Sequence, residues 1–144
     1  MTKDIIDVIQ RKLKELEHTL LFLKTESLNI SIQNIKDDMI RYWGIERGIQ
    51  IAIENIIDIA NIIISISDKE KPNTYRETMA LLSEIEVVPK AFSGKLSNMV
   101  GFRNILVHDY TKIDPEIILD ILKNDFNDFI LFTTYINEWL KKNY

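Results

Sequence analysis

Residues 101–110 read Gly-Phe-Arg-Asn-Ile-Leu-Val-His-Asp-Tyr, and this stretch decides how the fold and function of the chain are interpreted. It places Arg103, His108 and Tyr110 close together at the end of an apolar helical pattern. Imidazole, with an unperturbed pKa of about 6.5, exchanges protons near neutral pH, and a planar guanidinium suits phosphate. Spacing alone leaves two interpretations open. One is a phosphate-directed site, and the other is a buried Arg–His pair that caps a helix end, with Tyr110 in the core.

The geometry of an ideal helix places these side chains on different sides. At about 100° per residue, Asn104 and His108 share one side, whereas Arg103 and His108 are about 140° apart. They meet at one phosphate only if the helix bends or ends near His108, or if the arginine side chain curls round. Between residues 88 and 113, four basic residues stand against one acidic residue, a local net charge of +3. This local charge favours an anion near the stretch.

Length, composition and charge limit the classes of protein to which this chain can belong. A chain of 144 residues predicts one domain, 1–144, with a sizeable core. Four glycines and three prolines argue against an all-β fold. The absence of cysteine excludes disulfides and zinc-thiolate sites, fits a reducing compartment, and leads us to expect a cytoplasmic protein. The net charge of −4 excludes bulk electrostatic binding of nucleic acid, so any RNA contact must be local and sensitive to salt.

The spacing of apolar residues predicts an all-α fold, an up-and-down bundle of four to five helices. The expected helices cover residues 4–24, 37–65, 74–86, 89–108 and 114–142. Residues 25–36 are expected as a connection and residues 67–73 as a loop. Thr74 and Asp114 are predicted N-caps, and Glu77 stands at the capping-box spacing from Thr74.

The expected helix over residues 37–65 has an unusual pattern. One narrow polar line carries Arg47, Gln50, Glu54, Asp58 and Asn61, and isoleucines cover almost every other direction. A surface helix shows a narrower apolar stripe, so this helix is predicted to pack on two sides, against its own domain and against a partner. The polar line is either its solvent strip or the wall of a polar cleft. These polar residues make a membrane span costly, and we expect a buried helix and no membrane association.

The run from residue 99 to residue 110 resembles the core motif of the HEPN superfamily and, more narrowly, of the HepT toxins. HepT toxins are encoded beside a minimal nucleotidyltransferase antitoxin, MntA. The resemblance covers essentially the full chain, although only the central run is specific. It implies a metal-independent ribonuclease in which Arg103 holds the scissile phosphate and His108 is the acid or base. It also implies that the antitoxin transfers AMP onto Tyr110.

Further expectations follow from this resemblance. One histidine per site is little for acid–base catalysis, so we predict a homodimer that brings two copies of Arg103 and His108 to one cleft. Asn104 and Asp109 would flank this site, and Arg47, Gln50, Glu54 and Asp58 would form its wall. No metal or cofactor is expected. The alternative is a non-catalytic nucleotide-binding or substrate-binding subunit of a nucleotidyltransferase, and a third interpretation is a purely structural dimer.

Overall fold

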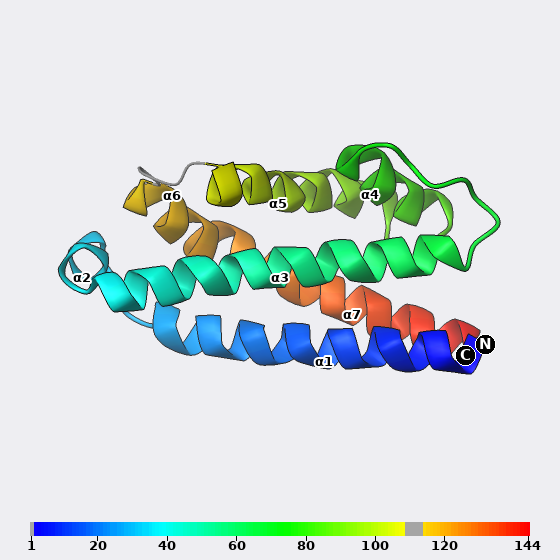
Figure 1. Ribbon diagram of the computed structural model, residues 1–144, viewed down its shortest axis with the longest axis horizontal. Helices are drawn as coiled ribbons and strands as arrows, with labels where there is room; N and C mark the ends of the chain where they lie inside the picture. Colours follow the sequence, from blue (N-terminus) through cyan, green and yellow to red (C-terminus); the bar gives the residue numbers. More distant parts are fainter. Residues whose placement is uncertain (1, 109–113) are drawn as a thin grey trace.

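The computed structural model describes residues 2–108 and 114–144, and throughout these ranges the chain forms helices joined by short loops, with no strand (Figure 1). This confirms the predicted all-α bundle. The elements are α1 (Thr2–Ser27), α2 (Ile32–Asp37), α3 (Met39–Ser65), α4 (Tyr75–Glu84), α5 (Lys90–His108), α6 (Pro115–Asp120), the π-helical turn η1 (Ile121–Asp125) and α7 (Phe126–Asn143).

Helix α3 runs through the centre of the bundle. It packs against α1 on one side and against α4 and α5 on the other, and α7 crosses beneath to contact α1 and α5 (Figure 1). Its isoleucines are buried among these helices, including Ile45, Ile49, Ile53, Ile56, Ile59 and Ile63. The expectation that this broad isoleucine surface needs a partner is therefore wrong, because helices of the same chain cover it.

One group of exposed apolar side chains lies at the end of α1, in the following loop and at the start of α3. This group comprises Leu21, Phe22, Leu28, Met39, Ile40 and Trp43. By length and composition α3 is also the one helix in the described ranges that could cross a membrane, but 61% of its most apolar window is buried inside the protein. That burial is typical of a core helix.

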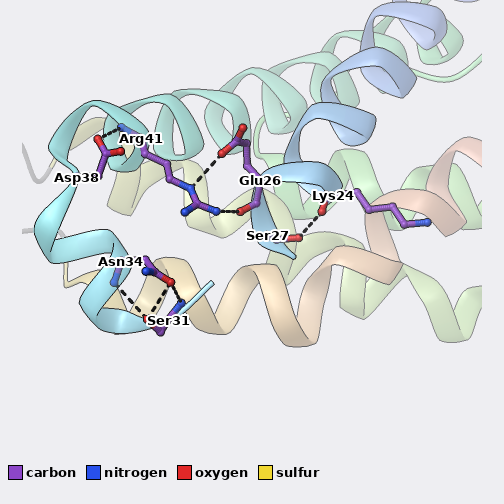
Figure 2. Close-up of polar contacts among 7 residues, drawn as sticks. All are labelled: Lys24, Glu26, Ser27, Ser31, Asn34, Asp38 and Arg41. Carbon is purple, nitrogen blue, oxygen red and sulfur yellow. Dashed lines mark hydrogen bonds and ion pairs between the residues drawn. The ribbon is translucent and has the colours of Figure 1, made fainter. Parts of the chain in front are cut away.

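The connection between α1 and α3 contains α2, a short helix that the apolar spacing did not predict. Ser31 begins it with a capping box, because Ser31 Oγ accepts from the Asn34 backbone N–H (3.2 Å) and Asn34 Oδ1 accepts from the Ser31 N–H (3.0 Å). Arg41 Nε donates to Glu26 Oε2 at 3.0 Å, and its terminal nitrogen donates to the Glu26 carbonyl at 2.6 Å (Figure 2). These bonds fix the end of α1 against the start of α3.

Capping residues set where α4 and α6 begin. Thr74 Oγ1 accepts from the Glu77 N–H at 3.1 Å, which confirms the predicted N-cap and makes Tyr75 the first residue of α4. Glu77 reaches back one residue further than a capping box requires and accepts from the Asn73 N–H at 3.0 Å. Asp114 caps α6 through the Glu116 N–H at 2.9 Å, as predicted. The expected last helix is the continuous run α6–η1–α7.

Candidate functional site

Arg103 lies on the side of α5 that faces α3, where three helices enclose a cleft of about 320 Å³. The cleft is lined by Glu54, Ile57, Asp58 and Asn61 of α3, Tyr75 of α4 and Arg103 of α5. The packing of α3 against α4 and α5 therefore brings together side chains that are far apart in the sequence. This cleft is the candidate site.

The Arg103 guanidinium is held by a ring and carries no ion pair within the described ranges. Its carbon lies 5.6 Å from the centre of the Tyr75 ring, a cation–π distance. Its Nε is buried and has no hydrogen-bond partner among the described residues, and buried polar atoms are usually paired. The ring thus contacts the cation in the cleft without neutralising its charge.

The two carboxylates of the cleft are each engaged with another side chain. Glu54 Oε1 accepts from Gln50 Nε2 at 3.3 Å, one turn earlier on α3. Asp58 Oδ2 lies 3.3 Å from the Nζ atom of Lys12, a residue of α1. These contacts explain how Arg103 can share a cleft with two carboxylates and form no ion pair with either of them.

The two interpretations of the polar line of α3 each hold for a different part of it. Glu54 and Asp58 line the cleft, whereas Arg47 is exposed and Gln50 is connected to the cleft through its bond to Glu54. The line is therefore a cleft wall in its later part and a solvent strip at its start. The roles of these four residues in binding or catalysis stay a prediction.

The remaining motif residues follow Arg103 along α5. The helix continues as far as His108, so Arg103 and His108 are about 140° apart around its axis. Asn104 is exposed. The side chain of His108 and the whole of Asp109 and Tyr110 lie outside the described residues, and their roles also stay predictions.

The outward face of α5 carries small residues. Gly94, Asn98, Gly101 and Ile105 follow one another at spacings of four, three and four residues, and all four are exposed. A Cβ added at Gly94 or Gly101 would meet nothing within 4 Å. Glycine inside a helix costs about 0.5–1 kcal/mol relative to alanine.

A second polar cluster links the start of α3 to the start of α6. The pKa of Tyr42 is raised to about 12, first by burial and then by the carboxylate of Glu46, which accepts a hydrogen bond from Tyr42, and by the carboxylate of Asp114. Burial also raises the pKa of Glu46, and the hydrogen bond from Tyr42 opposes this effect. The effect of Asp114 on Tyr42 indicates that the N-cap of α6 lies near the start of α3.

Sequence reasoning did not find Tyr75 or Lys12 as members of this site. Lys12 belongs to no motif in the sequence, and Tyr75 is only the residue after the predicted N-cap Thr74. Their contacts join residues 46 and 28 positions apart, and no local pattern predicts such pairs. In the described ranges, no three His, Asp or Glu side chains converge closely enough to hold a metal ion.

Comparisons with known proteins agree with this architecture. A family model described as "Ribonuclease HepT-like" matches residues 9–136. An mRNA nuclease HepT of Shewanella oneidensis is 31% identical over 101 residues, 70% of this chain and 76% of the relative. A tRNA nuclease HepT of Aphanizomenon flos-aquae is 26% identical over 112 residues, 78% of this chain and 76% of the relative. The tri-AMPylated S. oneidensis HEPN toxin, solved in complex with MNT antitoxin, superimposes with a TM-score of 0.81 at 26% identity, covering 92% of this chain and 98% of that chain.

Proposed function

Because the chain belongs to the ribonuclease HepT-like family, we propose that it is a metal-independent endoribonuclease, the toxin of a toxin–antitoxin pair, that acts in the cytoplasm as a single HEPN-like domain. The observation that carries the proposal is the state of Arg103. It is a fixed cation without an ion pair among the described residues, in a cleft, five positions before a histidine on the same helix. Such a cation is suited to hold a phosphate.

The proposed reaction uses the RNA itself as nucleophile. The 2′-hydroxyl loses its proton to a base and attacks the adjacent phosphorus, and an acid protonates the leaving 5′-oxygen. His108 serves as base or acid, and Arg103 stabilises the negative charge that develops on the phosphate oxygens. The products are a 2′,3′-cyclic phosphate and a 5′-hydroxyl.

The proposed active form is a homodimer. Concerted catalysis needs an acid and a base, and each chain offers one motif histidine, so a two-fold axis near α5 would bring a second His108 to the same RNA. The exposed glycines Gly94 and Gly101 support this arrangement, since residues without a side chain allow two helices to approach closely, and the exposed Ile105 on the same face would add apolar contact. Asn104, exposed beside Arg103, would flank the shared cleft.

The proposed control is AMPylation of Tyr110 by a partner nucleotidyltransferase of the MntA type. The related toxin that was solved in tri-AMPylated form with its MNT antitoxin supports this partner. Nucleotide phosphates attached two residues after His108 would add negative charge near Arg103. They would compete with RNA for the same cation.

Cleavage of total RNA in EDTA tests the proposal, with the wild-type protein beside His108→Ala and Arg103→Ala. We expect cleavage by the wild type alone, leaving cyclic phosphate ends, and circular dichroism should show that all three proteins are folded. Intact mass must first show that Tyr110 carries no AMP. Nucleotide binding without cleavage by unmodified wild type would overturn the nuclease and favour the binding subunit of a nucleotidyltransferase.

A further inference from the structure

Tyr75 is the residue of the cleft that no motif predicted. Its ring lies 5.6 Å from the Arg103 guanidinium carbon, and both side chains line the same cleft. We propose that Tyr75 is a positioning residue, which holds the Arg103 guanidinium in the orientation that receives the RNA phosphate. The inference rests on the proposed function, because it assigns Arg103 to the phosphate.

A ring holds an arginine differently from a carboxylate. A carboxylate takes up the N–H groups of the guanidinium and neutralises its charge, and phosphate must then displace it. An aromatic ring attracts the cation through its face and leaves the N–H edge free. Since the guanidinium must carry its charge and its donors to the phosphate, a ring is the holder that does not compete with the substrate.

The backbone of Tyr75 is fixed by the first turn of α4. Thr74 caps this turn, and the buried Thr78 hydroxyl donates to the Thr74 carbonyl at 3.0 Å. Met79, four residues after Tyr75, is fully buried in the core. The ring therefore extends from a capped helix end, and Tyr75 keeps 39% of its surface exposed.

A double-mutant cycle tests whether Tyr75 acts through Arg103. The probe is a short single-stranded RNA with 2′-O-methyl groups, which blocks the nucleophile so that binding is measured without cleavage. The proteins are wild type, Tyr75→Leu, Tyr75→Phe, Arg103→Ala and the Tyr75→Leu/Arg103→Ala double variant. Tyr144→Leu, which removes an exposed tyrosine outside the cleft, is the matched control.

We expect Tyr75→Leu to weaken binding about two- to fivefold, the size of a cation–π contact at a partly exposed site. Tyr75→Phe should bind like wild type, because the ring is kept. In the Arg103→Ala background Tyr75→Leu should have no further effect. With cleavable RNA, Tyr75→Leu should lower kcat about tenfold with a smaller change in KM, because a misplaced group costs rate more than binding.

Three results would overturn the inference. They are an equal effect of Tyr75→Leu with and without Arg103, an equal loss in Tyr75→Phe, or no loss at all. Binding of the probe without cleavage of natural RNA would refute the proposed nuclease while the cycle still decides the role of Tyr75. Failure of the parent to bind the probe would refute both.

Discussion

Replacing Lys12 by methionine tests whether this lysine keeps Asp58 away from Arg103. The Lys12 Nζ lies 3.3 Å from Asp58 Oδ2, and the two side chains are 26% and 50% exposed. An ion pair at that exposure contributes about 0–1 kcal/mol to stability. Lys12→Met should therefore change the free energy of unfolding by less than about 1 kcal/mol, so a large effect on activity would have another cause.

The expected effect on activity comes from the freed carboxylate. Asp58 and Arg103 line the same cleft, and opposite charges 4 Å apart attract by about 1 kcal/mol in water and about 4 kcal/mol at an effective dielectric of 20. The cleft is open, so a value near the lower limit applies. Because about 1.4 kcal/mol corresponds to a tenfold change in rate, competition by Asp58 should lower kcat/KM for RNA about five- to tenfold.

The assay is cleavage of one RNA oligonucleotide by wild type, Lys12→Met, Asp58→Asn and the double variant, at low and high salt. The double variant should recover most of the lost activity, because the asparagine side chain carries no charge. Lys14→Met, which removes an exposed lysine from the same helix, is the control for loss of bulk charge. A double variant no better than Lys12→Met, or an equal loss in Lys14→Met, would refute the reasoning.

Three further predictions concern packing, assembly and pH. Gly48→Ala should lower the free energy of unfolding by about 1 kcal/mol in urea, because its Cβ would lie 2.9 Å from Leu23 Cδ2 and this overpacking, about 1–3 kcal/mol, exceeds the gain of about 0.5–1 kcal/mol from alanine in a helix; unchanged stability would contradict this. Gly101→Leu should fold like wild type yet sediment as a monomer, since its side chain meets only open space within the chain; a dimer that persists would move the interface elsewhere. Burial and two neighbouring carboxylates raise the pKa of Asp125, so Asp125→Asn should stabilise the fold by a few tenths of a kcal/mol at pH 7. That gain should disappear below about pH 4, and a gain that persists in acid would contradict the assignment.

Local signals predicted most of the fold. The N-caps Thr74 and Asp114 were readable because a side-chain oxygen and the following backbone N–H groups are neighbours in sequence. The helix α2 was missed because it has six residues, too few for an apolar period, although the Ser31–Asn34 pair was a capping signal. The π-helical turn within the last helix was also missed, because it keeps nearly the same apolar face.

The site was less predictable than the fold. Arg103 was identified from its motif, but whether it was paired or available depended on side chains of α1, α3 and α4. The polar line of α3 was open to two interpretations, because periodicity gives the direction of a side chain and not what packs opposite it. The isoleucines were assigned to a partner for the same reason, since the sequence does not show how much of a helix its own chain covers.

The charge of the chain makes the arrangement around Arg103 necessary for the proposed reaction. A protein with a net charge of −4 repels RNA at long range, and the cleft contains Glu54 and Asp58. An RNA phosphate can bind there only if other side chains already engage these two carboxylates and neither carboxylate engages the Arg103 guanidinium. Lys12 offsets the charge of Asp58, the Gln50 amide holds the Glu54 carboxylate by a hydrogen bond without removing its charge, and Tyr75 contacts Arg103 without neutralising it. These three neighbours take no part in the proposed chemical step. Together they would leave the positive charge of Arg103 available to the RNA phosphate.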